Sequence, residues 1–362
     1  MTETHSRKVY LDWIRVIAIM LVIFNHLPGY ALYEEGGAGR PFYLFLSLLT
    51  RINVPLLFMV SGALLLGREE SVKTILKKRV LRIVVVLFFA YLGLYLLRIF
   101  HDHFLHGEPL AFPVPEILSG IISKKLIPTD AGPYWYLYAY LGYLLMLPFL
   151  RKAVKDMGKE LMILLLVLHG LIYTALPIVN LFLHDNAKIV LSDSFQVTLA
   201  VEKAFFYPIV GYWMDRNINV RQAGRKTMIL IALLGLAAAG IIDACILLSS
   251  APTGPASVTY IRMTDWITTI CAFLLIKRLV LVSCPRLETG KAAKRIAAVS
   301  ALCFGIYLLD SWLKLILFGA YYKFASVLPV LVYSLLWIPV SMFVGGTITW
   351  LLRKIPGVSK YL

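Results

Sequence analysis

The chain is dominated by long apolar segments that alternate with short polar ones. Apolar runs of about 18 residues or more are long enough to cross a bilayer as helices. Ten such runs are present, at 9–31, 42–67, 83–105, 134–150, 161–183, 203–215, 227–249, 264–283, 296–319 and 325–352. The sixth is short and the tenth is long. The pattern predicts an all-α, polytopic membrane bundle of about ten transmembrane helices, forming a single domain over residues 1–362.

The composition supports this fold class. The chain is 60% hydrophobic and 15% charged, and its mean hydropathy is +0.79. Soluble domains are about 45–50% apolar and about 25% charged, so a soluble globular protein is excluded. The first apolar run is long and contains charged residues, so we expect a membrane helix there rather than a cleavable signal peptide.

The basic residues are distributed unevenly between the two sides of the predicted bundle. With the N-terminus on the cytoplasmic side, 25 Lys and Arg fall in inner segments, 7 in outer segments and 4 within spans. Cytoplasmic loops collect Lys and Arg, so both termini are predicted to be cytoplasmic. This bias also accounts for the net charge of +16, and we expect no nucleic-acid partner.

The first span carries charged and titratable residues in the stretch "LDWIRVIAIMLVIFNH", residues 11–26. Arg15 and His26 are eleven residues apart, about three helical turns, so both project from one face roughly 16 Å apart. Asp12 precedes Arg15 by three residues and can pair with it as a structural partner. A charge inside a bilayer costs about 2.5–3.5 kcal/mol or more. This face is therefore expected to line a protein interior or a watery cavity.

The second span adds Arg51, predicted at a depth similar to that of His26, and the segment "FMVSGALL", residues 58–65. Small residues let helix backbones approach closely, so Ser61–Gly62 is predicted first as a packing site.

The inner segment "REESVKTILKKRVLR", residues 68–82, contains four cations within six residues: Lys77, Lys78, Arg79 and Arg82. Arg79 and Arg82 share a helical face at this spacing. The positive-inside bias explains part of this cluster. The cluster also suits an anionic ligand, such as a phosphate-bearing cofactor.

These segments together resemble acyltransferase family 3, a family of membrane O-acyltransferases. The first span matches its signature, an Arg or Lys followed after ten residues by His, and "RVLR", residues 79–82, matches its Arg-x-x-Arg motif. Three further segments are similar in order: "VPLLFMVSGALL" at 54–65, "YWYL" at 134–137 and "FGIYLLD" at 304–310. Many members have His after the late segment, whereas this chain has Asp310, so the role of that His is not carried over.

The resemblance implies an activity and a set of site residues. Family members move an acyl group, usually acetyl, from cytoplasmic acyl-CoA to a hydroxyl of a surface glycan or its lipid-linked precursor. By the motif match, Arg79 and Arg82, with Lys78 beside them, would hold the CoA phosphates, and Arg15 would guide the donor. His26 would be the catalytic residue, either as general base or as a transient acyl carrier, and the sequence leaves both open.

Other residues are candidates for binding the substrate. Stabilising a developing oxyanion needs a hydrogen-bond donor near the thioester carbonyl, and Asn25, Arg51 and Ser61 are the candidates. Trp135 either stacks on a sugar or belongs to an interfacial aromatic belt.

The remaining expectations concern metals, location and a rival function. "HDHFLH", residues 101–106, holds metal-ligating residue types, but without further ligands we expect no metal.

We expect a bacterial plasma membrane protein that contacts lipid, acyl-CoA and a glycan, with homo-oligomerisation left open. The alternative is a secondary transporter of a glycan precursor or small anion, since buried Arg, His and Asp suit one.

Overall fold

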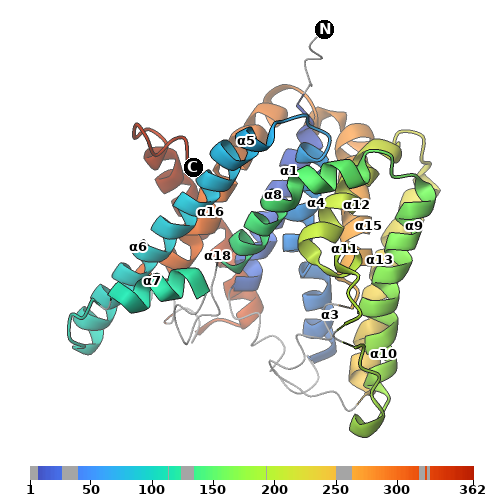
Figure 1. Ribbon diagram of the computed structural model, residues 1–362, viewed down its shortest axis with the longest axis horizontal. Helices are drawn as coiled ribbons and strands as arrows, with labels where there is room; N and C mark the ends of the chain where they lie inside the picture. Colours follow the sequence, from blue (N-terminus) through green and yellow to red (C-terminus); the bar gives the residue numbers. More distant parts are fainter. Residues whose placement is uncertain are drawn as a thin grey trace. The chain divides into compact units, whose positions relative to one another are not determined.

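The computed structural model describes residues 7–26, 40–112, 114–123, 134–192, 194–249, 263–317, 323 and 327–362. Within these ranges every regular element is a helix (Figure 1). The predicted span ends at 27–31, 318–319 and 325–326 lie outside the described residues. The chain divides into two compact units, one from Met1–Arg68 and Phe149–Ala301, the other from Glu69–Pro148 and Leu302–Leu362. Each unit is described by itself.

The first unit contains most of the helices. They are α1 (Val9–His26), α3 (Arg40–Thr50), α4 (Asn53–Leu65), α9 (Lys159–Gly170), the π-helical turn η2 (Leu171–Ala175), α10 (Leu176–Leu181), α11 (Thr198–Val201), α12 (Lys203–Asn217), α13 (Arg225–Leu248), α15 (Asp265–Arg278), the π-helical turn η5 (Leu279–Ser283) and the first part of α16 (Gly290–Ile316). Short 3₁₀ turns lie at Asp185–Ala187 and Pro285–Leu287.

The second unit is built from fewer and longer helices. They are α5 (Val72–Thr74), the π-helical turn η1 (Ile75–Val80), α6 (Leu81–His106), α7 (Val114–Ser123), most of α8 (Trp135–Val154), the rest of α16 and α18 (Val330–Leu352).

Eight helical segments of the described chain are long and apolar enough to cross a membrane. They are Val9–His26, Pro41–Leu65, Val72–His106, Lys159–Leu181, Arg225–Leu248, Asp265–Ser283, Gly290–Ile316 and Leu331–Leu352. The prediction of a polytopic helical membrane protein is confirmed. The remaining two predicted spans form helices α8 and α12, which are not among the eight, so the count of ten stays a prediction.

The second and third predicted spans differ from the structure in ways that bear on the site. The second is interrupted at residues 51–52, between α3 and α4. The third begins earlier than predicted, because Val72–His106 forms one helical segment that includes the basic cluster. Ser71 starts it as an N-cap, accepting a hydrogen bond from the Thr74 N–H at 3.2 Å, which satisfies one of the helix's open amide groups.

Helix α12 packs directly against α4 through two glycines. A Cβ atom at Gly62 would lie 1.9 Å from the carbonyl oxygen of Pro208, and one at Gly211 would lie 2.3 Å from that of Met59. Such distances are closer than atoms can approach, so only glycine fits at both positions. The packing prediction for Gly62 is confirmed. α12 has 15 residues and spans about 22 Å, less than the roughly 30 Å hydrocarbon core, and about half of its side chains are buried.

The C-terminal end of α12 is capped by a lysine from another helix. Lys277 of α15 donates hydrogen bonds to the main-chain oxygens of Met214, Asp215 and Ile218, at 3.1, 2.9 and 2.8 Å. The last carbonyls of a helix have no partner within the helix, and a cation at this end also suits the helix dipole. Lys277 therefore fixes the end of α12 against α15.

Substitution of Gly62 by Ala tests the α4–α12 contact. We expect a destabilisation of about 1–3 kcal/mol or more, because the added methyl group forces two backbones apart. The measurement is the midpoint of thermal unfolding of the purified protein in detergent. Gly142→Ala in α8 is the matched control, since no atom lies within 4 Å of a Cβ at that position. Equal midpoints for the two variants would contradict the contact.

Candidate active site on α1

The polar face of α1 keeps the geometry that its sequence predicts. α1 is α-helical without a break from Val9 to His26, so Arg15 and His26 lie about three turns apart on one face. The Arg15 side chain is 29% exposed, and His26 is partly exposed at the last position of the helix. A cation and an imidazole are therefore both accessible on a helix whose other faces are mostly buried.

Asp12 fixes Arg15 through a network of three side chains. The Asp12 carboxylate is 6% exposed and lies 3.4 Å from Nη1 of Arg15, which is the pairing predicted from the sequence. Ser300 of α16 donates to Asp12 Oδ1 at 2.7 Å and accepts from Arg15 Nη1 at 2.7 Å. Since Ser300 bonds both members of the pair, it sets the position of the Arg15 guanidinium.

A second arginine contributes to the same network. Arg7 donates to both Asp12 oxygens, at 2.6 and 3.0 Å. The hydrogen bond to Asp12 raises the pKa of Arg7 above its ordinary value. Sequence reasoning missed both Arg7 and Ser300. Ser300 is 285 residues from Arg15 in the chain, and a serine in an apolar segment gives no local signal of such a contact.

Asn25 joins the end of α1 to the break between α3 and α4. Its amide nitrogen donates to the main-chain oxygens of Leu21 and Thr50, at 2.9 and 3.0 Å. The Thr50 hydroxyl donates back to Asn25 Oδ1 at 3.2 Å. Because Thr50 immediately precedes Arg51, this contact places the α3–α4 break beside the end of α1.

Ser61 lies about two turns into α4, next to Gly62. Its hydroxyl donates to the main-chain oxygen of Leu57 at 2.9 Å, a local bond within the helix that is common for serine.

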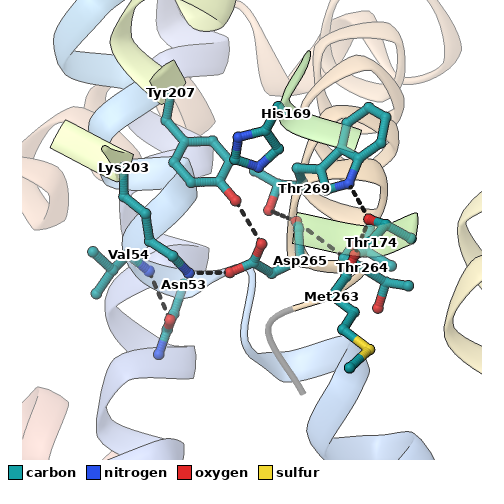
Figure 2. Close-up of polar contacts among 12 residues, drawn as sticks. Asn53, Val54, His169, Thr174, Lys203, Tyr207, Met263, Thr264, Asp265 and Thr269 are labelled. Carbon is teal, nitrogen blue, oxygen red and sulfur yellow. Dashed lines mark hydrogen bonds and ion pairs between the residues drawn. The ribbon is translucent and has the colours of Figure 1, made fainter. Parts of the chain in front are cut away.

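A second polar cluster lies at the start of α12 and was not predicted from the sequence. The Asp265 carboxylate, at the first position of α15, is 2% exposed and forms an ion pair with Lys203. Tyr207 donates to its other oxygen at 2.7 Å. Figure 2 shows Lys203 and Tyr207, one turn apart on α12, both reaching this carboxylate. The cluster ties the first turns of α12 and α15 together.

A buried histidine lies in the same region as this cluster (Figure 2). His169 of α9 is 0% exposed, and its ring stacks on Phe206 at a centroid distance of 3.6 Å. One ring nitrogen, Nδ1, bonds to the main-chain oxygen of Ala200. Nearby, Trp266 donates to the Thr174 hydroxyl at 2.9 Å. These contacts join α9 and η2 to α11, α12 and α15.

A third buried carboxylate holds the start of α1 to the end of α12. Asp215 has a side chain that is 3% exposed, and Lys8 lies 2.5 Å from its Oδ2 atom. The hydroxyl of Tyr10 donates to its Oδ1 atom. Because Asp12 and Asp215 hold two neighbouring parts of α1, the helix that carries Arg15 and His26 is fixed at its N-terminal end.

The second unit contains the arginines of the Arg-x-x-Arg motif. Arg79 lies in the π-helical turn η1, a helix type that often occurs at functional sites, and binds Glu70 through two contacts of 3.0 and 2.5 Å. Arg82, in the first turn of α6, donates to the main-chain oxygens of Tyr361 and Leu362 at 3.0 and 3.3 Å. Both guanidinium groups therefore contact oxygen atoms.

The other candidates of this unit are more exposed. Lys78 is exposed on η1, and Trp135, the first residue of α8, is 37% exposed. These positions leave both side chains accessible to a ligand.

Asp310, the residue that departs from the late family motif, is a buried member of a polar group in α16. It is 0% exposed and accepts from Ser341 at 2.9 Å and from the Trp337 ring nitrogen at 3.4 Å. Lys314 lies one turn further along α16, with its nitrogen 3.5 Å from Oδ2. Asp310 thus joins α16 to α18 within the second unit.

The Asp265 cluster gives a prediction about stability. Removing one member of a buried ion pair is destabilising by about 3–5 kcal/mol, because it leaves the other charge buried and uncompensated. We expect Asp265→Ala to lower the midpoint of thermal unfolding strongly. Replacing both charges, as in Lys203→Met with Asp265→Leu, should restore much of the lost thermal stability. Glu288→Ala, which breaks the exposed Arg221–Glu288 pair, is the control and should change stability by about 0–1 kcal/mol. The prediction would be contradicted if Asp265→Ala lost no more stability than the Glu288→Ala control.

Comparison with known proteins identifies the family. A search of curated proteins and a search of solved structures each found no match. The family model of acyltransferase family 3, described as an acyltransferase domain, matches residues 8–353. This range is nearly the whole chain and includes every site residue that the sequence predicts. The chain therefore belongs to acyltransferase family 3, which assigns it to the multi-pass membrane acyltransferases.

Proposed function

We propose that this acyltransferase moves an acetyl group from cytoplasmic acyl-CoA to a hydroxyl of a cell-surface polysaccharide or its lipid-linked precursor, in a bacterial plasma membrane. The observation that carries the proposal is the polar face of α1. There, Asp12 and Ser300 hold Arg15 in place, and His26 follows three turns later on the same unbroken helix. A donor bound near Arg15 would extend its thioester toward His26.

His26 serves as the proton acceptor in this proposal. Imidazole takes up and returns a proton near neutral pH, and a positioned general base contributes on the order of 10²–10⁴-fold to the rate. The acceptor hydroxyl gives its proton to His26 while its oxygen bonds to the thioester carbonyl carbon. The carbon–sulfur bond then breaks, and the CoA thiolate leaves and takes up the proton. In the alternative route, His26 itself carries the acyl group before the hydroxyl attacks.

The contacts of Arg79 support its proposed role in donor binding. Its guanidinium already holds a carboxylate, that of Glu70, through two nitrogen–oxygen contacts. Arginine binds phosphate in the same two-pronged geometry, so the site is suited to a CoA phosphate that would displace Glu70. Arg82 and the exposed Lys78 would add positive charge beside it.

The hydrogen bonds in the first unit narrow the choice of oxyanion donor. Asn25 gives its amide hydrogens to the main-chain oxygens of Leu21 and Thr50, and Ser61 gives its hydroxyl hydrogen to Leu57. Arg51, the cation at the α3–α4 break, is proposed as the group that would stabilise negative charge on the thioester oxygen, because a charged donor forms the stronger hydrogen bond to an oxyanion. The exposed Trp135 is proposed to stack on the acceptor sugar.

Substitution of His26 by Ala tests the catalytic proposal. We expect the rate of acetyl transfer from acetyl-CoA to fall by about 10²–10⁴-fold, because no other group would take the hydroxyl proton. The measurement is the release of free CoA thiol by purified protein in liposomes with a glycan acceptor. The matched control is His184→Ala, since His184 is exposed on the loop after α10. Unchanged turnover in the His26 variant, with normal membrane insertion, would remove His26 from the mechanism.

Substitution of Glu70 by Gln tests the donor site. If Arg79 binds a CoA phosphate, the neutral amide competes less well than the carboxylate for the guanidinium. We therefore expect the KM for acetyl-CoA to fall several-fold with little change in kcat, the pattern of altered ground-state binding. Steady-state kinetics over a range of acetyl-CoA concentrations measures both constants. If Arg79 is instead only structural, the KM will stay the same or rise.

A further inference from the structure

The C-terminal end of α6 brings together three metal-ligating side chains. The ligating atoms of His101, Asp102 and His106 all lie within 4.8 Å of one another. This cluster belongs to the second unit and shares no residue with the proposed acyl-transfer site. The sequence stretch "HDHFLH" contains the same residue types, but it does not show which of its three histidines converge.

The distances within the cluster suit a small divalent ion. His101 Nδ1 and Asp102 Oδ1 are 3.0 Å apart, and the rings of His101 and His106 have centroids 5.9 Å apart. Zinc binds histidine nitrogen and carboxylate oxygen at about 2.0–2.2 Å in a tetrahedral arrangement, which places neighbouring ligand atoms about 3.3 Å apart. The His101 Nδ1 and Asp102 Oδ1 atoms, 3.0 Å apart, are already close to this separation.

The end of the helix determines which histidines take part. Gly107 adopts a left-handed conformation with φ of 71°, and its N–H donates to the main-chain oxygen of His103 at 3.1 Å. The His103 ring lies apart from the other two, with Nδ1 bonded to the main-chain oxygen of Glu108 at 2.7 Å. His103 is therefore a natural internal control for the cluster.

The neighbouring guanidinium of Arg98 would affect how strongly this cluster binds a metal ion. Arg98, one turn before Asp102, donates to its Oδ2 atom at 3.4 Å, while Oδ1 faces His101. The guanidinium leaves one carboxylate oxygen directed toward the histidines, but its positive charge opposes a second cation nearby.

We propose that His101, Asp102 and His106 bind a divalent transition-metal ion of the zinc type. Two imidazoles and one carboxylate form a common zinc ligand set, with water at the fourth position. The ion would cross-link the last turns of α6 and stabilise this end of the helix. Protons compete with the metal for the imidazole nitrogens, so binding weakens as the pH falls.

Zinc titration of the purified full-length protein tests the site. The protein carries a purification tag without histidine, is stripped with a chelator and is titrated with zinc chloride by calorimetry. We expect one high-affinity site per chain. His106→Asn should weaken binding at least tenfold, and because His106 is exposed, this variant should fold normally. His101→Asn should weaken binding similarly, whereas His103→Asn should bind like the unmodified protein.

Arg98→Gln provides a test in the opposite direction. Removing the guanidinium should tighten zinc binding, because its positive charge then no longer opposes the metal ion. The proposal is overturned if the unmodified protein binds no zinc, or if the His106 variant binds as tightly as the parent. It is also overturned if His103→Asn loses as much affinity as His106→Asn.

Discussion

A charge removed from water must be paired, and this constraint organises the first unit. Three of its carboxylates, Asp12, Asp215 and Asp265, are nearly inaccessible to solvent, and each binds a cation. An uncompensated charge in such a place would be strongly unfavourable. Each carboxylate also joins distant parts of the chain: Asp12 accepts a hydrogen bond from Ser300 of α16, Asp215 binds Lys8 at the start of α1, and Asp265 binds Lys203 of α12. The paired charges thus act as fixed points between helices that otherwise make apolar contacts.

Helix α12 shows how these fixed points work together with packing. It is short, and its middle touches the backbone of α4 at two glycines. Its first turn is bound to Asp265 and its last turn to Lys277 and Lys8. Small residues allow helices to approach closely in a membrane, where the hydrophobic effect does not drive their association. The polar contacts at both ends then determine the position of the helix along its neighbours.

The same network places the proposed catalytic face. α1 is held by Asp12 and Asp215 near one end and by Asn25 near the other. A helix fixed at both ends presents Arg15 and His26 in a defined orientation, which catalysis by proximity requires. In the second unit, Glu70 and main-chain oxygens hold the motif arginines in a similar way. In the proposed donor site, the arginines would therefore exchange one oxygen ligand for another when a phosphate binds, and no flexible side chain would have to be ordered.

The sequence by itself determined the helical membrane architecture and the family, because hydropathy, helical spacing and short motifs are local properties. It predicted the pairing of Asp12 with Arg15, which are three residues apart, and the packing role of Gly62. It did not reveal Ser300, which meets Asp12 across 288 residues, or the Lys203–Asp265 pair across 62. It also gave no reason for helix α3 to end before Arg51. Such contacts depend on which helix faces are brought together, and only the tertiary structure decides that, since local spacing carries no information about distant partners.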